Sequence, residues 1–450
     1  MPGGLLTDLY ELNMAVSYLR RGMTGPATFS LFVRRLPPDR GFLIAAGLED
    51  CLAFLEQFAF TTADIAWLAE SRGFSERDLE ALRRLRFTGD VWAVPEGTAM
   101  FAGEPLVEVT APIAEAQLAE TVLLNHVTFQ TGIASKAARC VLAAGGAQLV
   151  DFSFRRTQGI EAGLAVARAS AIAGFASTSN TEAARRYGLT AAGTMAHSYV
   201  EALGSEDRAF TAFAGDFPGK TTFLVDTYDT EQGIRAAIDV ARRLRLPGPV
   251  GVRLDSGDLA SLAFLARRLL DDAGLPDARI FASGGLDEYA IAALVASGAP
   301  IGAYGVGTKM GVSADAPYLD SAYKLVAYGG RPVMKLSRGK ATWPGAKQVH
   351  RGPAGDVLAL RDEEGPPGHR QLLVPVVRGG RRLGPPEPLA DAVRRCAASL
   401  ARLPPAALAL RRPKPVPVTA SRALTASRRQ LTRDLRRGPA ALGPLPVMDR

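Results

Sequence analysis

Residues 249–285 read PVGVRLDSGDLASLAFLARRLLDDAGLPDARIFASGG, and their pattern decides the fold. An apolar, β-rich run (249–255) precedes a segment with helical apolar spacing (259–273), and a second apolar run (278–283) follows it. Two strands separated by a helix form a βαβ unit, in which the strands pair in parallel because the helix carries the chain back across the sheet. This stretch therefore predicts a parallel sheet.

The same alternation fills the second half of the chain. Strand-like apolar runs occupy residues 147–154, 173–178, 190–195, 221–226, 249–255, 278–283 and 301–306. Helical patterns separate most of them, at 159–173, 181–187, 198–213, 230–243, 259–273 and 287–297. Seven strands in this order predict a parallel sheet covered by helices, or a closed barrel, because runs without polar alternation fit strands that are buried on both faces.

Polar residues and glycines follow the runs at the same end of each. They are Arg155, Ser179, Thr194, His197, Asp226, Arg253, Asp255, Gly284, Gly285, Gly305, Gly307 and Thr308. In α/β barrels the loops at the carboxyl ends of the strands build the active site. We therefore expect these residues to lie on one catalytic face.

Residue type suggests the chemistry of that face. The turns around Gly284 and Gly307 let backbone N–H groups approach an anion closely, as the last loops of many barrels do when they bind phosphate. Arg253 and Asp255 are two residues apart and share one side of their strand, where they suit a phosphorylated ribose with Mg²⁺. A surface ion pair is the alternative. A loop like that of P-loop nucleotide-binding proteins, at residues 214–222, is rejected because a strand pattern follows it where a helix is required.

The composition limits the class of protein. Of the 450 residues, 47% are hydrophobic and 22% charged, which is typical of a globular protein with a large core. No stretch has the length of a membrane span, and the N-terminus has no signal-peptide pattern. The three cysteines have no metal-site or redox spacing. We expect a cytoplasmic protein that has no membrane or nucleic-acid partner.

The net charge of +8 is confined to the end of the chain. Residues 401–450 hold eleven Lys and Arg and two Asp, a balance of +9, so the rest of the chain is close to neutral. Because this segment is rich in Pro, Ala and Arg, it is interpreted as a basic tail that is disordered or loosely attached. A polyanion-binding arm is the alternative.

The predicted domains follow from these patterns. Residues 1–125 contain a first amphipathic helix (8–21), an extended segment (27–37), further helices and a β-rich segment (90–112), and are assigned to an N-terminal α/β domain. Residues 126–345 are assigned to the barrel and its catalytic face. Residues 346–400 are expected to pack on the N-terminal domain, and 401–450 form the tail.

Seven ordered motifs resemble the nicotinate phosphoribosyltransferase family. They are TDLYEL (7–12), DFSFRRTQG (151–159), GTMAHSYVEA (193–202), GVRLDSGDL (251–259), SGGLDEY (283–289), GVGTKM (305–310) and YKLV (323–326). The resemblance implies an irregular α/β barrel of the type II phosphoribosyltransferase kind. A second α/β domain is then built from the N-terminal region and later segments. It also implies nicotinate and phosphoribosyl pyrophosphate as substrates, ATP as co-substrate, Mg²⁺, NAD salvage and a homodimer with a shared active site.

The resemblance also implies residue roles. His197 corresponds to the histidine that ATP phosphorylates. Nicotinate contacts are implied for Tyr10, Arg155, Ser179, Thr194 and Arg253. Tyr10 would come from the partner subunit, and its alternative interpretation is a core aromatic of the first helix. Contacts to phosphoribosyl pyrophosphate are implied for Asp255, Gly284, Gly285, Gly305, Gly307 and Thr308. The sequence fixes no metal ligand, although Asp255 could share Mg²⁺ with the substrate.

Three other functions remain open at this point. In nicotinamide-using relatives an aspartate stands where Ser179 is found, so the serine favours nicotinate. A Schiff-base aldolase would need a lysine at a strand end, and Lys220 and Lys309 are poorly placed for that. A non-catalytic barrel with an RNA-binding tail would leave the residues at the strand ends without a role.

Overall fold

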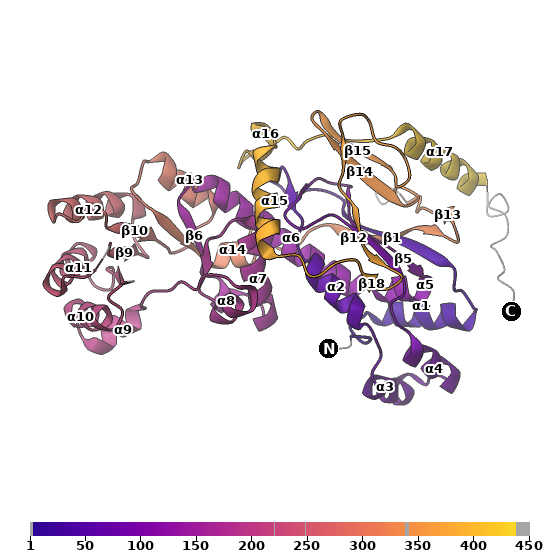
Figure 1. The fold of residues 1–450 in the computed structure, drawn as a ribbon, viewed down its shortest axis with the longest axis horizontal. Helices are drawn as coiled ribbons and strands as arrows, with labels where there is room; N and C mark the ends of the chain where they lie inside the picture. The colour runs from indigo at the N-terminus through magenta and orange to yellow at the C-terminus, as the bar shows by residue number, and fades with distance from the viewer. Residues whose placement is uncertain (1–2, 220, 248, 338–341, 438–450) are drawn as a thin grey trace. The chain divides into compact units, whose positions relative to one another are not determined.

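The computed structural model describes residues 3–219, 221–247, 249–337 and 342–437. Two compact units divide the chain, and each contains its own sheet (Figure 1). Unit 1 comprises Met1–Gly132 and Tyr318–Arg450, and unit 2 comprises Ile133–Pro317. The barrel domain expected at 126–345 thus ends earlier in the structure, because the segment from Tyr318 onward belongs to unit 1.

Unit 2 is built on a curled sheet of six parallel strands. Their order is β7 (Ser177–Thr178), β6 (Gln148–Asp151), β11 (Ala303–Val306), β10 (Arg279–Ala282), β9 (Gly251–Leu254) and β8 (Thr222–Leu224). Every pairing between neighbours is parallel, as the sequence predicts. The sheet of the described residues does not close, because β7 and β8 form its edges. It is a half-barrel, the irregular form of the expected architecture.

One predicted strand is wrong. Residues 190–195 contribute only a single parallel bridge, between Ala191 and Thr178. The run reads Thr-Ala-Ala-Gly-Thr-Met, and its small residues offer little side-chain surface to pack on a sheet.

The helices of unit 2 alternate with its strands. They are α7 (Ile160–Ala173), α8 (Thr181–Tyr187), α9 (His197–Leu203), α10 (Glu206–Asp216), α11 (Thr230–Leu244), α12 (Leu259–Asp272), α13 (Glu288–Ala296) and α14 (Thr308–Gly311). The single helix expected at 198–213 is split into α9 and α10. Gly204 ends α9 in the left-handed region, at φ +79°, and the Ser205 side chain caps α10. The first of these two helices is short and begins at His197.

Unit 1 contains an antiparallel sheet of seven strands. Its order is β13 (Arg331–Pro332), β12 (Ser321–Tyr328), β1 (Pro26–Val33), β5 (Pro105–Pro112), β3 (Asp90–Ala93), β17 (Val374–Arg378) and β18 (Arg381–Arg382). The strand β12 follows unit 2 in the chain and pairs with β1 over seven residues. This pairing explains why the segment after residue 317 belongs with the N-terminal region.

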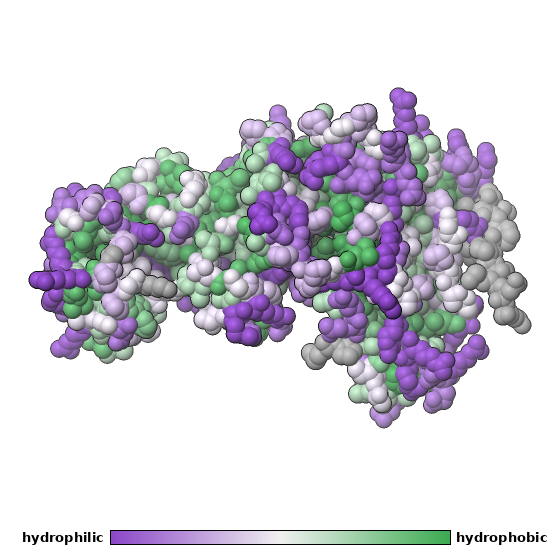
Figure 2. All heavy atoms as spheres, viewed as in Figure 1, coloured by the Kyte–Doolittle hydropathy of each residue, from purple (hydrophilic) through white to green (hydrophobic). Residues whose placement is uncertain are grey.

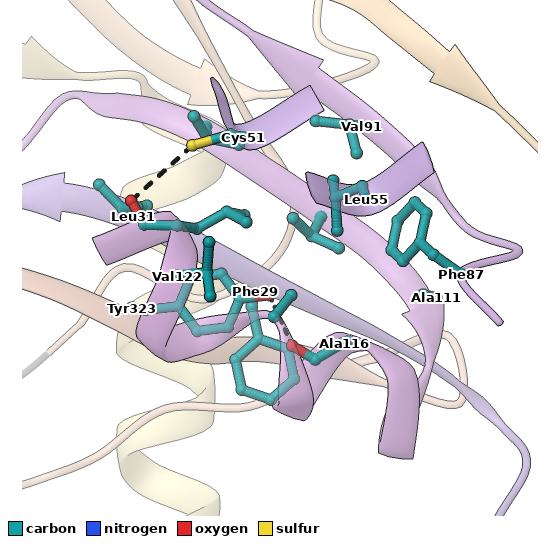
Figure 3. Packing of buried hydrophobic residues seen from close by; sticks show 14 of the residues in the cluster. Phe29, Leu31, Cys51, Leu55, Phe87, Val91, Ala111, Ala116, Val122 and Tyr323 are labelled. Carbon is teal, nitrogen blue, oxygen red and sulfur yellow. Dashed lines mark hydrogen bonds between the residues drawn. The ribbon is translucent and has the colours of Figure 1, made fainter. Parts of the chain in front are cut away.

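Helices contribute buried residues to the same hydrophobic core as this sheet. They are α1 (Leu9–Arg20), α2 (Leu48–Gln57), α3 (Thr62–Arg72), α4 (Glu76–Arg84), α5 (Ile113–Leu118) and α6 (Glu120–Ala143), whose last residues belong to unit 2. Strands β2 (Leu43–Ile44) and β4 (Ala99–Met100) form a separate pair. Figure 3 shows Phe29 and Tyr323 in this core, with ring centroids 4.8 Å apart. The Tyr323 hydroxyl donates to the Ala116 carbonyl at 2.8 Å, so the buried polar atom is satisfied.

The expectation of a disordered tail is wrong for residues 401–437. A third sheet has the order β16 (Arg370–Gln371), β14 (Lys347–Gly352), β15 (Gly355–Leu360) and β19 (Val418–Ala420), so the tail supplies its edge strand. Around it the chain also forms α15 (Leu389–Ala401), α16 (Pro405–Leu408) and α17 (Arg422–Arg437). The helix α17 is amphipathic: Leu424 and Leu431 are buried, although most of its other residues are polar or basic. Residues 438–450 lie outside the described residues.

No helix among the described residues is long and apolar enough to cross a membrane. The face drawn in Figure 2 mixes hydrophilic and hydrophobic residues in small areas.

Packing of the tail predicts that Leu424→Ala destabilises unit 1. Its side chain is fully buried, and removing a buried leucine costs about 2–5 kcal/mol. Chemical denaturation followed by circular dichroism measures the loss. The exposed Arg429→Ala on the same helix is the control and should change the free energy of unfolding by less than about 0.5 kcal/mol. Equal stability of the two variants would show that α17 does not pack as described.

Candidate active site

Arg253 is the centre of a hydrogen-bonded cluster at the carboxyl edge of the parallel sheet. It lies on β9, is 9% exposed, and its guanidinium carbon lies 5.2 Å from the Phe152 ring centroid. The guanidinium donates to Ser283 Oγ (2.8 Å), Thr194 Oγ1 (2.9 Å) and Asp255 Oδ1 (2.7 Å). These bonds fix the orientation of a buried positive charge, which suits recognition of an anion.

Asp255 is held between two neighbouring strand ends. Its backbone N–H donates to Asp226 Oδ2 at 2.9 Å, and Ser256 Oγ donates to the same oxygen at 2.6 Å. Ser283 Oγ donates to the Asp255 carboxylate from β10. Burial raises the pKa of Asp255, but Ser283, Arg253 and His197 outweigh it and leave the pKa below its ordinary value. Asp255 is therefore a carboxylate at neutral pH.

His197 lies beside this carboxylate. Its Nε2 is 4.0 Å from Asp255 Oδ2, and its Nδ1 lies 3.2 Å from Thr227 Oγ1. The side chain is 40% exposed, so a ligand can reach the ring. An imidazole that is oriented by a hydroxyl on one nitrogen and remains accessible can act as a nucleophile through the other nitrogen.

A buried carboxylate organises the end of β6. Asp151 accepts hydrogen bonds from Ser153 N (2.9 Å), Ser153 Oγ (2.5 Å) and Thr178 Oγ1 (2.8 Å). Burial raises the pKa of Asp151 despite these bonds. They fix the turn into the short 3₁₀ helix Phe154–Arg156, which carries Arg155. Arg155 and Ser179 are both exposed at this edge, and within the described residues neither side chain bonds to the Arg253 cluster.

The two glycine-rich turns, after β10 and after β11, lie close to the residues of the cluster. Gly284 has φ +92°, and a Cβ there would lie 2.0 Å from the Asp255 carbonyl oxygen. Gly285 also lies in the left-handed region, but open space surrounds its Cβ position. A Cβ at Gly305 would meet the Phe152 ring at 2.7 Å. Gly307 precedes α14, whose first residue, Thr308, is exposed. Close packing of the strand ends thus requires glycine at two of these positions.

Tyr10 lies in unit 1, on α1, and is 49% exposed. The alternative interpretation of this residue as a core aromatic is therefore wrong. Burial of the hydroxyl, together with the nearby Glu120 and Glu11, raises the pKa of Tyr10. The phenol is protonated at neutral pH and can donate a hydrogen bond.

The sequence indicates no specific role for Ser283, Asp226, Thr227 or Phe152, which complete the cluster. The position after a strand does place Asp226 and Ser283 at the catalytic face. Thr227 and Phe152 gave no such signal, because ordinary side chains next to a strand end are common in any α/β fold.

Among the described residues, no group of three or more His, Cys, Asp or Glu side chains could hold a metal ion. The protein alone therefore builds no metal site in this part of the chain. Two carboxylate oxygens at the cluster nevertheless suit Mg²⁺. Asp226 Oδ1 is buried and accepts no hydrogen bond from the described residues, and Asp255 Oδ2 faces His197 at 4.0 Å. Since Mg²⁺ takes one or two carboxylates together with substrate phosphates, the residues fit this ion.

The fold and the site together define a class of protein. It is an α/β enzyme with a hydrogen-bonded arginine cluster at the carboxyl edge of a parallel sheet, and an accessible histidine lies beside this cluster.

Comparisons with known proteins specify the family. Residues 5–128 match the nicotinate phosphoribosyltransferase N-terminal domain, and residues 147–337 match the nicotinate phosphoribosyltransferase family. The chain belongs to this family.

Relatives match most of the chain. A Mycobacterium tuberculosis protein named nicotinate phosphoribosyltransferase pncB2 is 50% identical over 398 residues, which cover 87% of this chain and 85% of that protein. A Bacillus subtilis nicotinate phosphoribosyltransferase is 44% identical over 379 residues, covering 80% and 76%. The crystal structure of human nicotinic acid phosphoribosyltransferase is similar with a TM-score of 0.84 at 30% identity, covering 94% of this chain and 99% of that chain. The expected fold class is thereby confirmed.

The glycine turn predicts different effects at two adjacent positions. Both Gly284→Ala and Gly285→Ala place a side chain in the left-handed region, at about 1–2 kcal/mol. Only Gly284→Ala also forces a Cβ against the Asp255 carbonyl, which should cost about 1–3 kcal/mol more. Urea unfolding of the two variants measures this difference. Equal destabilisation would contradict the close approach of the two strand ends.

Proposed function

We propose that this protein is a nicotinate phosphoribosyltransferase that forms nicotinate mononucleotide and pyrophosphate from nicotinate and 5-phosphoribosyl 1-pyrophosphate. ATP hydrolysis would be coupled to the transfer through a phosphohistidine at His197, and the reaction would serve NAD salvage. The relatives named above support the transferase activity. The observation that carries the proposal is the position of His197, 4.0 Å from an Asp255 that bonds to Arg253.

Nicotinate would be bound through its carboxylate and its ring. Arg253 supplies the buried positive charge, and Thr194 and Ser179 supply hydroxyls that can donate to a carboxylate. Arg155 would lie over one face of the pyridine ring. In a homodimer, the other face would be covered by Tyr10 from the partner subunit, and its exposure on α1 supports this role.

The transfer step needs no general base. The lone pair of the pyridine nitrogen attacks C1 of the ribose, and the C1–O bond to pyrophosphate breaks with its electron pair leaving on oxygen. No proton moves in this step. Asp255 would bind the ribose hydroxyls, and the turns at Gly284, Gly285, Gly305, Gly307 and Thr308 would hold the phosphates through backbone N–H groups. Mg²⁺, held by Asp226, Asp255 and the donor phosphates, would neutralise charge on the leaving pyrophosphate.

The hydrogen bond of His197 supports its proposed phosphorylation. If Nδ1 carries the proton and donates to Thr227, the Nε2 lone pair is free to attack the γ-phosphorus of ATP. The bond from that phosphorus to the bridging oxygen breaks, and ADP leaves. Water later cleaves the P–N bond and releases phosphate. The neighbouring Asp255 would repel the phosphoryl group, which favours this hydrolysis.

The proposal predicts that His197→Ala loses both phosphate labelling from γ-labelled ATP and the stimulation of nicotinate mononucleotide formation by ATP. Basal transfer should persist, because the ring and donor contacts lie on other residues. Assays of the purified protein with nicotinate, donor and Mg²⁺, with and without ATP, measure both effects. His126→Ala, in unit 1, is the control and should behave like the native protein. Acid-labile label that remains on the His197 variant would contradict the phosphohistidine.

Selectivity for nicotinate gives a second prediction. Ser179→Asp places a negative charge beside the substrate carboxylate, and losing a charge-assisted hydrogen bond of about 1.5–3 kcal/mol should raise the KM for nicotinate at least tenfold. Ser179→Ala removes the hydroxyl without adding charge, so its KM should rise less. Steady-state kinetics with nicotinate and nicotinamide measure the effect. An unchanged nicotinate KM in the aspartate variant would place the selectivity elsewhere.

A further inference from the structure

Unit 1 contains a cavity that the catalytic cluster of unit 2 does not use. Its volume is about 720 Å³, within the range of about 300–1,000 Å³ that is usual for small-molecule sites. The turn between β14 and β15, the end of α15, the loop before α16 and the segment before β19 form its walls. In Figure 1 these elements belong to the C-terminal part of the chain, coloured orange to yellow.

Positive charge dominates the lining. Arg351, Arg370, Arg402 and Lys414 face the cavity, and Asp356 is the single carboxylate among its lining residues. Arg351 pairs with Asp356 at 2.5 Å. Within the described ranges, no carboxylate forms an ion pair with Arg370, Arg402 or Lys414.

Electrostatics show that these cations act on one another. Burial lowers the pKa of Arg370, and the positive charges of Arg351 and Arg402 lower it further, with only Asp356 opposing them. Behind the wall, burial raises the pKa of Glu104, and the adjacent Asp356 raises it further. The three exposed cations Arg370, Arg402 and Lys414 therefore favour binding of an anion between them.

The remaining lining is apolar, apart from the buried Ser399. Phe101, Leu403 and Val416 contribute, together with prolines of the loop before α16 and of residues 415–417. The Arg351 guanidinium lies 5.1 Å from the Phe101 ring centroid, so the ring also fixes this cation. A free inorganic anion would leave the apolar walls unused. The lining fits a ligand with both a phosphate group and an apolar ring system.

We propose that this cavity is a binding site for a nucleotide-sized organic phosphate, with the phosphates against Arg370, Arg402 and Lys414 and the apolar ring system against Leu403 and Val416. A concave site of this volume favours such a small molecule over a nucleic acid or a membrane surface, which need an extended basic face. The site is separate from the transferase reaction proposed above and does not depend on it.

The test uses ADP as the probe on the full chain, and hydrogen–deuterium exchange locates where it binds. Binding at the cavity should slow exchange in peptides covering residues 351–356 and 399–417. Inorganic tripolyphosphate and adenosine, which each carry half of the ligand chemistry, should bind at least about tenfold more weakly than ADP there. The double variant Arg370→Gln/Arg402→Gln should raise the Kd of ADP at these peptides by at least about tenfold.

Matched controls separate this site from other effects. The double variant Arg21→Gln/Arg77→Gln removes two exposed arginines of unit 1 that do not line the cavity and should leave the protection unchanged. Thermal unfolding establishes that both double variants fold. Protection by ADP only at residues 251–258 would overturn this proposal while leaving the transferase intact. Equal binding of tripolyphosphate and ADP, or unchanged protection in Arg370→Gln/Arg402→Gln, would also overturn it.

Discussion

Parallel pairing of β8, β9 and β10 is the constraint on which the site depends. Leu224 pairs with Arg253, and Leu254 pairs with Ala282, so the residues after each strand emerge at the same edge of the sheet. This register brings together Asp226, Asp255 and Ser283, which are otherwise about thirty residues apart in sequence. An antiparallel arrangement would send alternate strand ends to opposite edges and separate them.

The Arg253 cluster turns this arrangement into a defined geometry. A buried guanidinium without partners would be strongly destabilising, and here three oxygens from three segments accept its hydrogen bonds. The same bonds orient Asp255, beside which His197 lies. The charge that we propose for substrate binding is thus held in place by the protein alone, which would reduce the reorganisation that catalysis requires.

Much of the parallel sheet could be predicted, because long apolar runs separated by amphipathic helices leave few other folds. The prediction of a strand at 190–195 was wrong, because a run of mostly small side chains does not show from sequence alone whether it pairs with a neighbouring strand. The order of the strands and the return of β12 to β1 are set by contacts distant in sequence, which a local pattern does not contain. The packing of α17 was missed because many arginines obscured two buried leucines.

The site was predictable to a similar degree. Arg253, Thr194, Asp255 and His197 were expected on one face, and the structure brings them together. The roles of Thr227 and Phe152 depend on distances that only the folded chain defines. Tyr10 lies in unit 1, and its contact with the ring belongs to the homodimer that we propose.

A crystal structure of the protein with nicotinate mononucleotide and pyrophosphate tests the central claim most directly. The account predicts the pyridine carboxylate beside Arg253 and Thr194, the ribose at Asp255, and the 5′-phosphate against the turns at Gly284 and Gly307. The account would be contradicted if the nucleotide bound away from the carboxyl edge of the parallel sheet and no ligand contacted the Arg253 cluster.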